Sequence, residues 1–297
     1  MDKPRTKEGY DDGITAECVR VLVTLLRGLG PWKESVYLVG GLAPKYIIEA
    51  APPEVPEHAG TLDVDLVIDQ KILEETEAYK TLEKNLKRIG FERATNDAGS
   101  KLSWRWQIRT DKGHLILLEF LVDAPGVGGG RVEPLPAKGR RVSALNVPHA
   151  SLVFDFHGES IETAELLGEN GIVEERIRHA NIVSFLCLKA FAFEDRYERK
   201  DAYDLNYCLE HAAIDAVTRG FRSALEGRRR DEINAAVDIL RRRFVGADRT
   251  RSHLLDGPVA VAKFELGEEN ASETRERRVL RQREVSSVIA SLLDELG

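Results

Sequence analysis

Residues 61–69, TLDVDLVID, alternate between aliphatic and acidic side chains, which is the pattern of a β-strand. Successive side chains of a strand point to opposite faces, so this strand has one apolar and one acidic face. The apolar face is formed by Leu62, Val64, Leu66 and Ile68, and the acidic face by Asp63, Asp65 and Asp69. Val67 adds a further aliphatic residue. So many aliphatic residues in one segment predict a strand inside a sheet and not at a polar edge.

The first half of the chain contains several more segments of this kind. Residues 35–39, SVYLV, predict a buried strand that turns at Gly40-Gly41. A short helix is expected next, over 42–50, because prolines follow it at 52 and 53. Strands are also predicted at 91–94, 102–110, 114–123 and, as edge strands, within 142–156; helices are predicted at 14–28 and 71–89, and a Gly- and Pro-rich loop at 124–139.

The second half has the apolar spacing of helices. These are predicted at 177–194, 200–212, 214–225, 231–244 and 276–296. The fold class is therefore expected to be mixed α/β (α+β), with a mixed sheet flanked by helices and then a helical region. We expect two domains, 1–175 carrying the sheet and 176–297 helical.

Composition excludes several classes of protein. With 43 Lys and Arg against 50 Asp and Glu, the net charge is −7, so a uniformly basic nucleic-acid coat protein is excluded. Three cysteines without a CxxC pair argue against a disulfide scaffold or a structural zinc site. No apolar stretch approaches the length of a membrane span, and no signal peptide is recognisable at the start. A cytoplasmic protein without membrane contact is expected.

Asp63 and Asp65 lie two residues apart on one strand face, about 7 Å along the chain. Their charges repel each other, which a divalent cation between them would relieve. The alternative is a solvated strand face. Glu119 interrupts the apolar run LILLEFLV, and a buried carboxylate needs a partner. If this strand neighbours 61–69, Glu119 completes a three-carboxylate metal site. The alternative is an ion pair with Arg105 or Arg109.

The Gly40-Gly41 turn is a second candidate for ligand binding. Glycines let a ligand approach the backbone, and the start of the following helix, with Lys45 in its first turn, suits a phosphate. The alternative is a glycine-tightened turn without a ligand. Oxygen ligands beside a phosphate-binding turn suit Mg²⁺ and a nucleoside triphosphate. Two ions about 4 Å apart would assist in-line attack on the α-phosphate.

A group of charged residues lies in the predicted helices of the second half. Lys189 and Arg196 are seven residues apart, about two helical turns, and so share a face. If the helix continued, Lys200 and Asp204 would lie within about 60° of that face. A helix break in this charged run is the alternative geometry, and a solvated face with ion pairs is the alternative to a site.

These segments together resemble a known superfamily. The arrangement VGG at 39–41, DVD at 63–65 and a later isolated carboxylate resembles the polymerase-beta-like nucleotidyltransferases, which include aminoglycoside adenylyltransferases. Residues 186–209, LCLKAFAFEDRYERKDAYDLNYCL, are similar to the AbiEii family. Its founding members are toxins of type IV toxin–antitoxin and phage-abortive systems. The resemblance covers residues 35–210.

This resemblance implies an activity and the residues for it. The activity is Mg²⁺-dependent transfer of a nucleoside monophosphate from an NTP to a hydroxyl group, with RNA or tRNA as acceptor and an antitoxin as partner. Alternatives are a small-molecule or protein side-chain acceptor, or a non-catalytic nucleotide-binding relative. The implied roles are phosphate binding by Gly40 and Gly41, metal binding by Asp63 and Asp65, proton transfer and metal binding by Glu119, triphosphate binding by Lys189, a further acidic role for Asp204, and nucleotide contacts by Lys45 and Arg196.

One position departs from the family pattern. The family usually has Ser or Thr after the glycine pair, whereas this chain has Leu42. The hydroxyl that could hold a phosphate is therefore missing, which keeps the non-catalytic alternative open.

Two weaker features concern nucleic acid. Residues 216–252 contain ten Arg and five acidic residues, so RNA contacts are conceivable, but a soluble helical surface is the simpler interpretation. Trp104 and Trp106 could stack on bases, but core packing is favoured.

Overall fold

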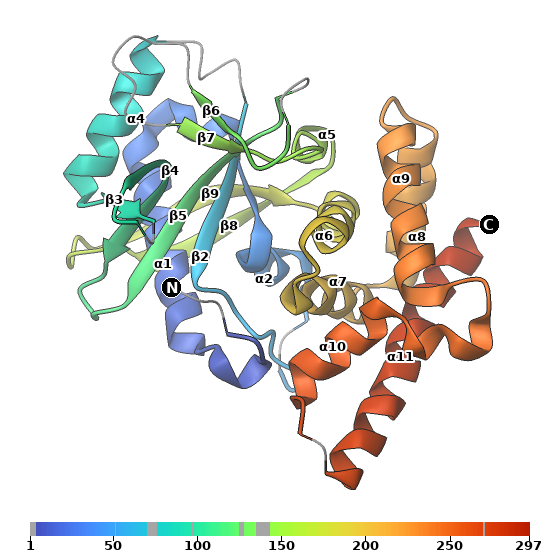
Figure 1. Ribbon diagram of the computed structural model, residues 1–297. Coiled ribbons are helices and arrows are strands. Elements are labelled where there is room, and N and C mark those ends of the chain that lie inside the picture. Colours follow the sequence, from blue (N-terminus) through green and yellow to red (C-terminus); the bar gives the residue numbers. More distant parts are fainter. Residues whose placement is uncertain are drawn as a thin grey trace. The chain divides into compact units, whose positions relative to one another are not determined.

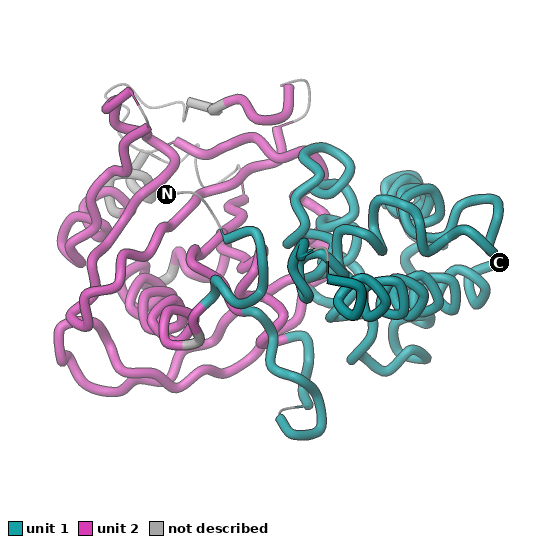
Figure 2. Tube along the Cα trace, turned by 60° about the horizontal axis from the view of Figure 1, so that its bottom comes forward, with its two compact units in different colours: residues 1–10, 47–59, 181–297 teal, residues 11–46, 60–180 magenta. Residues whose placement is uncertain are grey.

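A computed structural model describes residues 4–50, 52–69, 76–96, 98–124, 128–134, 143–269 and 271–297. The chain divides into two compact units (Figure 2). The sheet unit comprises Asp11–Tyr46 and Gly60–Ala180, and the helical unit comprises Met1–Tyr10, Ile47–Ala59 and Asn181–Gly297. The main division thus lies after Ala180, compared with the expected boundary after residue 175. The helical unit also takes in two segments from the first sixty residues.

The sheet unit is built on a mixed sheet (Figure 1). Within the described residues the sheet has nine strands, seven of them in the order β3-β4-β5-β2-β1-β9-β8, with β7 beside β5 and β6 beside β7. The strands are β1 Val36–Val39, β2 Asp63–Ile68, β3 Glu92–Thr95, β4 Lys101–Arg109, β5 Leu115–Val122, β6 Val132–Pro134, β7 Ser143–Asn146, β8 His157–Glu165 and β9 Ile172–Ala180. Strand β2 is parallel to β5 and antiparallel to β1. The expected mixed α/β fold is confirmed.

One face of this sheet is covered by helices. α1 (Asp12–Leu29) packs against β2, β5, β8 and β9, and α4 (Thr76–Ile89) packs beside α1 (Figure 1). The core contains the even-numbered residues of β2 and β5, namely Val64, Leu66, Ile68, Ile116, Leu118, Phe120 and Val122. Because the side chains alternate, the odd-numbered residues of both strands, including the acidic ones, point to the opposite face. The apolar and acidic faces predicted for residues 61–69 are therefore observed.

Most predicted elements of the sheet unit are confirmed. The helix at 14–28 is α1, and the segments 91–94 and 102–110 form the antiparallel pair β3 and β4. The helix expected over 42–50 is shorter. A 3₁₀ turn, η3 (Gly40–Leu42), precedes the single turn of α2 (Pro44–Ile47). The two turns stay separate because Pro44 has no N–H to donate back to the first.

Other predictions for this unit were partly met. Residues 71–75 of the helix expected at 71–89 lie outside the described residues, as do 125–127 and 135–139 of the loop expected at 124–139. That loop contains β6. The weak edge strands expected within 142–156 correspond to β7 and are followed by the short helix α5 (Leu152–Asp155).

The helix expected at 177–194 was wrong at its beginning. Strand β9 continues to Ala180, and α6 (Ile182–Arg196) begins after Asn181, whose side chain accepts hydrogen bonds from the amides of Val183 and Ser184. The hairpin β8–β9 was not predicted. Its strands are rich in Glu and Arg that form cross-strand pairs, such as Arg178 with Glu159, so aliphatic alternation is weak.

The helical unit contains α6 together with α7 Arg199–His211, α8 Ile214–Leu225, α9 Arg230–Leu240, α10 Asp256–Leu266 and α11 Ser272–Leu296. Two shorter turns, η4 (Arg241–Val245, a π turn) and η5 (Arg249–Leu254), join α9 to α10, and η1 (Lys7–Gly9) lies near the start. The predictions at 200–212 and 214–225 match α7 and α8 closely, whereas α10 was missed. None of the helices in the described ranges is both long and hydrophobic enough to cross a membrane.

Candidate metal centre

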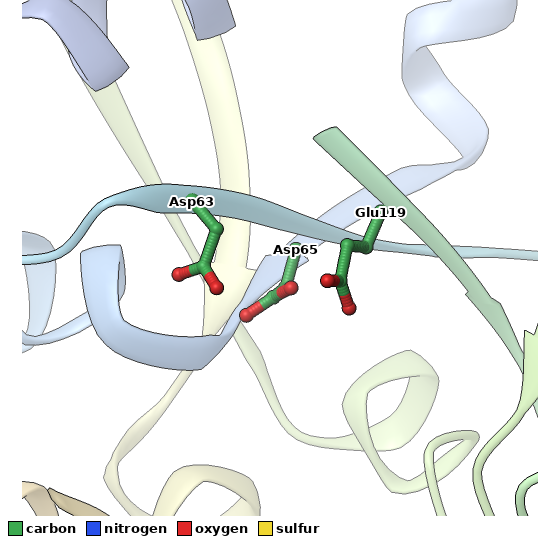
Figure 3. Close-up of side chains that lie close together, drawn as sticks. All are labelled: Asp63, Asp65 and Glu119. Carbon is green, nitrogen blue, oxygen red and sulfur yellow. The ribbon is translucent and has the colours of Figure 1, made fainter. Parts of the chain in front are cut away.

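Three acidic side chains meet on the face of the sheet opposite α1, and we call Asp63, Asp65 and Glu119 the acidic triad. The parallel pairing of β2 and β5 places Asp65 opposite Glu119, with Asp63 two residues away on the same face (Figure 3). One carboxylate oxygen from each residue lies within 4.8 Å of the others. Asp63 and Glu119 are buried, at 4% and 8% exposure. Glu119 was predicted to complete the site if its strand neighboured residues 61–69. The pairing of β2 with β5 confirms that the two strands are neighbours.

A hydrogen bond holds one of these carboxylates, and an ion pair holds another. Thr61 Oγ1 donates to Asp63 Oδ1 over 2.7 Å. Arg105 Nη2 lies 2.7 Å from Glu119 Oε1, so the ion pair considered as the alternative to a metal role is present beside the acidic triad. Arg109, the other candidate partner, instead donates to the carbonyl of Gly113. Both environments considered for Glu119 are therefore present: it lies close to two aspartates, and it pairs with an arginine.

Gly40 fits closely against the acidic triad. Its φ of 71° lies in the left-handed region, and a Cβ there would come within 2.0 Å of Asp65 Oδ2. Any other residue would collide with this carboxylate, so glycine allows Asp65 to sit directly against the turn. The first predicted phosphate-binding residue is therefore brought next to the metal candidates by the β1–β2 pairing.

The residues after Gly40 have other surroundings. Gly41 lies in the same 3₁₀ turn, η3, and Leu42 is 1% exposed and part of the hydrophobic core. The family that the sequence resembles has a Ser or Thr hydroxyl at this position, whereas here the Leu42 side chain packs into the core. Lys45 Nζ pairs with Glu162 Oε2 on β8 at 2.8 Å, a partner that the sequence did not predict.

The donor set fits a hard divalent cation. All three members of the triad offer carboxylate oxygens, which are the ligands preferred by Mg²⁺. The thiol of Cys18 donates to the carbonyl of Thr61, and burial together with Asp63 and Asp65 raises its pKa well above the usual range. Cys18 therefore stays a protonated thiol at neutral pH and offers no soft thiolate ligand to a metal.

A second set of predicted site residues lies in the helical unit. Lys189 Nζ donates to Asp201 Oδ1 at 2.9 Å and to Asp204 Oδ2 at 2.7 Å, and Arg196 forms two hydrogen bonds to Asp201. Lys200 pairs with Asp204. Lys189 is 7% exposed and Asp204 fully buried. The helix does not continue through this run: α6 ends at Arg196 and Tyr197 is left-handed, so the break considered as the alternative geometry is the one observed.

The two aspartates of this set are ionised. Burial by itself would raise the pKa of Asp204, but Lys189 and Lys200 outweigh it and hold the pKa well below the usual range. The same balance of burial against Lys189 and Arg196 lowers the pKa of Asp201. In return these carboxylates outweigh the burial of Lys189 and raise its pKa. The predicted contact of Lys189 with a triphosphate stays a prediction, as does the role of Asp204.

His58 belongs to this buried set and was missed by the sequence reasoning. Its Nε2 lies 2.8 Å from Asp204 Oδ1, and its ring stacks on Tyr203. The surrounding segment 47–59 is fixed to α7, because Tyr207 donates to the carbonyl of Pro56 and the amide of Ala59 donates to Tyr203. His58 and Asp204 are 146 residues apart in the chain, so no local spacing indicates their contact. We call Lys189, Arg196, Lys200, Asp201, Asp204 and His58 the charged network.

The arginines and tryptophans singled out in the sequence also have clear environments. Arg243 pairs with Glu194 and Asp256, and Arg241 with Asp238, which favours a soluble, ion-paired helical surface. Trp106 is 1% exposed and belongs to the hydrophobic core, as favoured from the sequence. Trp104 does not: it is only half-buried, and the Arg105 guanidinium lies over its ring at 4.6 Å.

Comparison with known proteins adds no assignment. No family model matches this sequence, and no curated protein matches it significantly. The assignment of function therefore depends on the geometry described above and on the sequence resemblance.

Gly40→Ala tests the fit of the turn against Asp65. The added methyl group must displace Asp65 Oδ2, so Mn²⁺ binding to the full chain should weaken about tenfold or more, measured by isothermal titration calorimetry. Gly30→Ala is the matched control, since Gly30 also has a positive φ, 59°, but its Cβ would meet nothing within 4 Å. Equal Mn²⁺ affinity in both variants would contradict the role of Gly40.

His58→Gln tests the buried histidine. Burial, with a contribution from Lys200, lowers the pKa of His58 from 6.5 to about 4, so the unfolded chain takes up this proton first as the pH falls. The free energy of unfolding should therefore rise between pH 4 and 6.5, by up to about 3 kcal/mol from this residue. Glutamine keeps a donor for Asp204 but does not titrate.

The measurement is urea unfolding across this pH range, followed by circular dichroism. The unfolding free energy of the wild type minus that of His58→Gln should increase as the pH rises from 4 to 6.5. His253→Gln, in η5 of the same unit, is the matched control for replacing a histidine by glutamine. Parallel curves for the wild type and His58→Gln would show that His58 does not titrate with folding.

Proposed function

We propose that this protein is a Mg²⁺-dependent nucleotidyltransferase. It transfers a nucleoside monophosphate from an NTP to an acceptor hydroxyl and releases pyrophosphate. The observation that carries the proposal is the acidic triad on adjacent parallel strands, with Gly40 packed against Asp65. Three oxygen donors beside a glycine turn form a place where a metal-bound polyphosphate can approach the backbone.

Each residue has a distinct role in this proposal. Asp63 and Asp65 hold Mg²⁺, which when bound stabilises the negative charge on the transferring phosphoryl group. Glu119 is the further metal ligand and accepts the proton of the attacking hydroxyl. Thr61 orients Asp63 through its hydroxyl group, and Gly40 and Gly41 leave the turn open to a phosphate.

The charged residues outside the acidic triad are assigned on the sequence: those of the helical unit on the resemblance, and Lys45 on its place after the glycine turn. Lys189, Arg196 and Asp204 would form the nucleotide-binding part of the helical unit. For Lys189 to bind a triphosphate, the phosphate must replace its contact with Asp201 or Asp204 or use its third ammonium proton. Lys45 would similarly exchange Glu162 for a phosphate.

The acceptor and the biological role also follow from the resemblance to AbiEii proteins. We propose an RNA acceptor, in particular tRNA, and a toxin or phage-defence role with a cognate antitoxin in the cytoplasm. The ion-paired arginines of the helical unit do not by themselves indicate RNA. A small molecule or a protein side chain as acceptor would use the same chemistry at the acidic triad.

One observation favours a second candidate, a non-catalytic nucleotide-binding protein. Leu42 is fully packed into the core at the position where the family has a hydroxyl, so that phosphate contact is lost. The acidic triad would then bind a metal-bound nucleotide without transfer.

The experiment is incubation of the full chain with Mg²⁺, total cellular RNA and each α-³²P-labelled NTP in turn, with pyrophosphate release followed in parallel. We expect one NTP to label RNA and Asp63→Asn to reduce the labelling about 100-fold or more. The matched control is Asp69→Asn, which removes a carboxylate just after β2, outside the acidic triad.

The other outcomes separate the alternatives. Label on protein would identify a side-chain acceptor. Pyrophosphate release without label on either macromolecule would indicate a small acceptor. NTP binding with no label and no pyrophosphate would support the non-catalytic candidate and contradict the transferase.

A further inference from the structure

Strand β8 forms an unprotected edge of the sheet. Among the described strands it pairs only with β9, so its other side carries no partner strand there. Its nine residues, His157–Glu165, pair with β9 without a bulge, and none of them is buried. The segment contains neither lysine nor proline, the residues that commonly protect such an edge. Ile161, at its centre, is 59% exposed.

The other edges of the described sheet are built differently. Strand β3 has four residues, and its register with β4 is irregular between Arg93 and Thr95. Strand β6 has three residues and ends at Pro134. Short strands, bulges and prolines are the usual means by which a protein prevents an edge from pairing with another chain. The chain protects these two edges and leaves the much longer edge of β8 open, which indicates that β8 pairs with a further strand.

The charges of β8 favour a second copy of β8 over a basic segment as that strand. Each of its glutamates already forms an ion pair within its own chain. The partners are Arg178 for Glu159, Lys45 for Glu162 and Arg20 for Glu165, at distances of 3.0, 2.8 and 3.2 Å. A segment rich in lysine or arginine therefore gains little at this edge, and a second strand with the same paired glutamates is only weakly repelled.

Two copies of β8 fit each other when they pair antiparallel about Ile161. A twofold axis perpendicular to the sheet at this residue lets all nine residues pair. It places Ile161 opposite Ile161 of the second copy, Glu159 opposite Thr163, and His157 opposite Glu165. The central pair is thus apolar, the outer pairs join an imidazole to a carboxylate, and no glutamate lies directly opposite another.

Neighbouring registers are less favourable. A shift by two residues is the smallest that keeps the same faces of the strands together, and in either direction it shortens the paired segment. A shift toward the carboxyl end also places Glu162 opposite its own copy and Glu159 opposite Glu165. Like charges directly opposite each other destabilise a strand pair. The register centred on Ile161 is therefore specified by both length and charge.

We propose that β8 is the interface between two copies of this chain, which pair antiparallel about Ile161 and join their sheets into one. The outward backbone N–H and C=O groups of β8 supply the hydrogen bonds, and Ile161 buries its exposed side chain against its copy. One strand pair is a small interface, so we expect a dissociation constant of about 1–100 μM. The inference depends neither on the acidic triad nor on the proposed function.

Sedimentation velocity of the full chain tests the dimer, at concentrations from about 1 to 200 μM. The sedimentation coefficient of the wild type should rise from that of a monomer to that of a dimer. Ile161→Lys removes the apolar contact and sets two like charges opposite each other, so the dissociation constant should rise about tenfold or more. Ile172→Lys is the matched control, because Ile172 is 73% exposed on β9 of the same hairpin and should leave the dissociation constant unchanged.

Disulfide formation tests the register. Opposite residues of an antiparallel pair have Cα atoms about 4.5–5.5 Å apart, which a disulfide can bridge. Oxidation of Ile161→Cys by copper phenanthroline should therefore give a covalent dimer. Thr163→Cys should not, because in this register the two copies of residue 163 lie about 14 Å apart along the strands. The native Cys18, Cys187 and Cys208 are buried and do not compete.

The measurements can overturn the inference in several ways. A wild type that stays monomeric at the highest concentration would do so, as would Ile161→Lys dimerising as tightly as the wild type. Equal cross-linking of Ile161→Cys and Thr163→Cys would contradict the register. Association that continues beyond the dimer would contradict a closed twofold interface. If Ile161→Lys did not fold, as judged by circular dichroism, the two cysteine variants would still decide between these outcomes.

Discussion

The sheet unit is organised around the repulsion between three carboxylates that its two central strands hold together. The parallel register of β2 and β5 fixes their backbone positions, so the side chains cannot simply move apart. A buried carboxylate without compensation is costly. Each feature near the acidic triad lowers this cost: the hydroxyl of Thr61 binds Asp63, and Arg105 neutralises Glu119. The remaining negative charge favours a cation.

This constraint extends to the neighbouring elements. Asp65 lies opposite Val39 at the end of β1, so the next residue must pass close to its carboxylate, and only glycine fits there. The turn that follows then places Leu42 in the core and separates η3 from α2 at Pro44.

The acidic triad was predictable because its signals are local. The alternation in residues 61–69 fixed the faces of β2, and the single acid in an apolar run identified Glu119. The sequence left open whether the two strands were neighbours, since strand order depends on contacts far apart in the chain. It also allowed both a metal and an arginine partner for Glu119, and in the structure Arg105 pairs with Glu119 while the two aspartates lie close by. His58 and the β8–β9 hairpin were missed for related reasons: one depends on a distant helix, and the other is held by polar cross-strand pairs that weaken the usual pattern.

The acidic triad and the charged network differ in the balance of their charges. In the network, Lys189 and Lys200 lie against Asp204, Arg196 binds Asp201, and burial keeps His58 neutral at neutral pH. Each of these charges already lies against one of opposite sign, so these residues can hold α6, α7 and the segment 47–59 together without any ligand. In the acidic triad, by contrast, three carboxylates lie within 4.8 Å of one another. Charges of one sign held together favour an ion of the opposite sign, whereas paired charges must first give up their contacts before they can bind one.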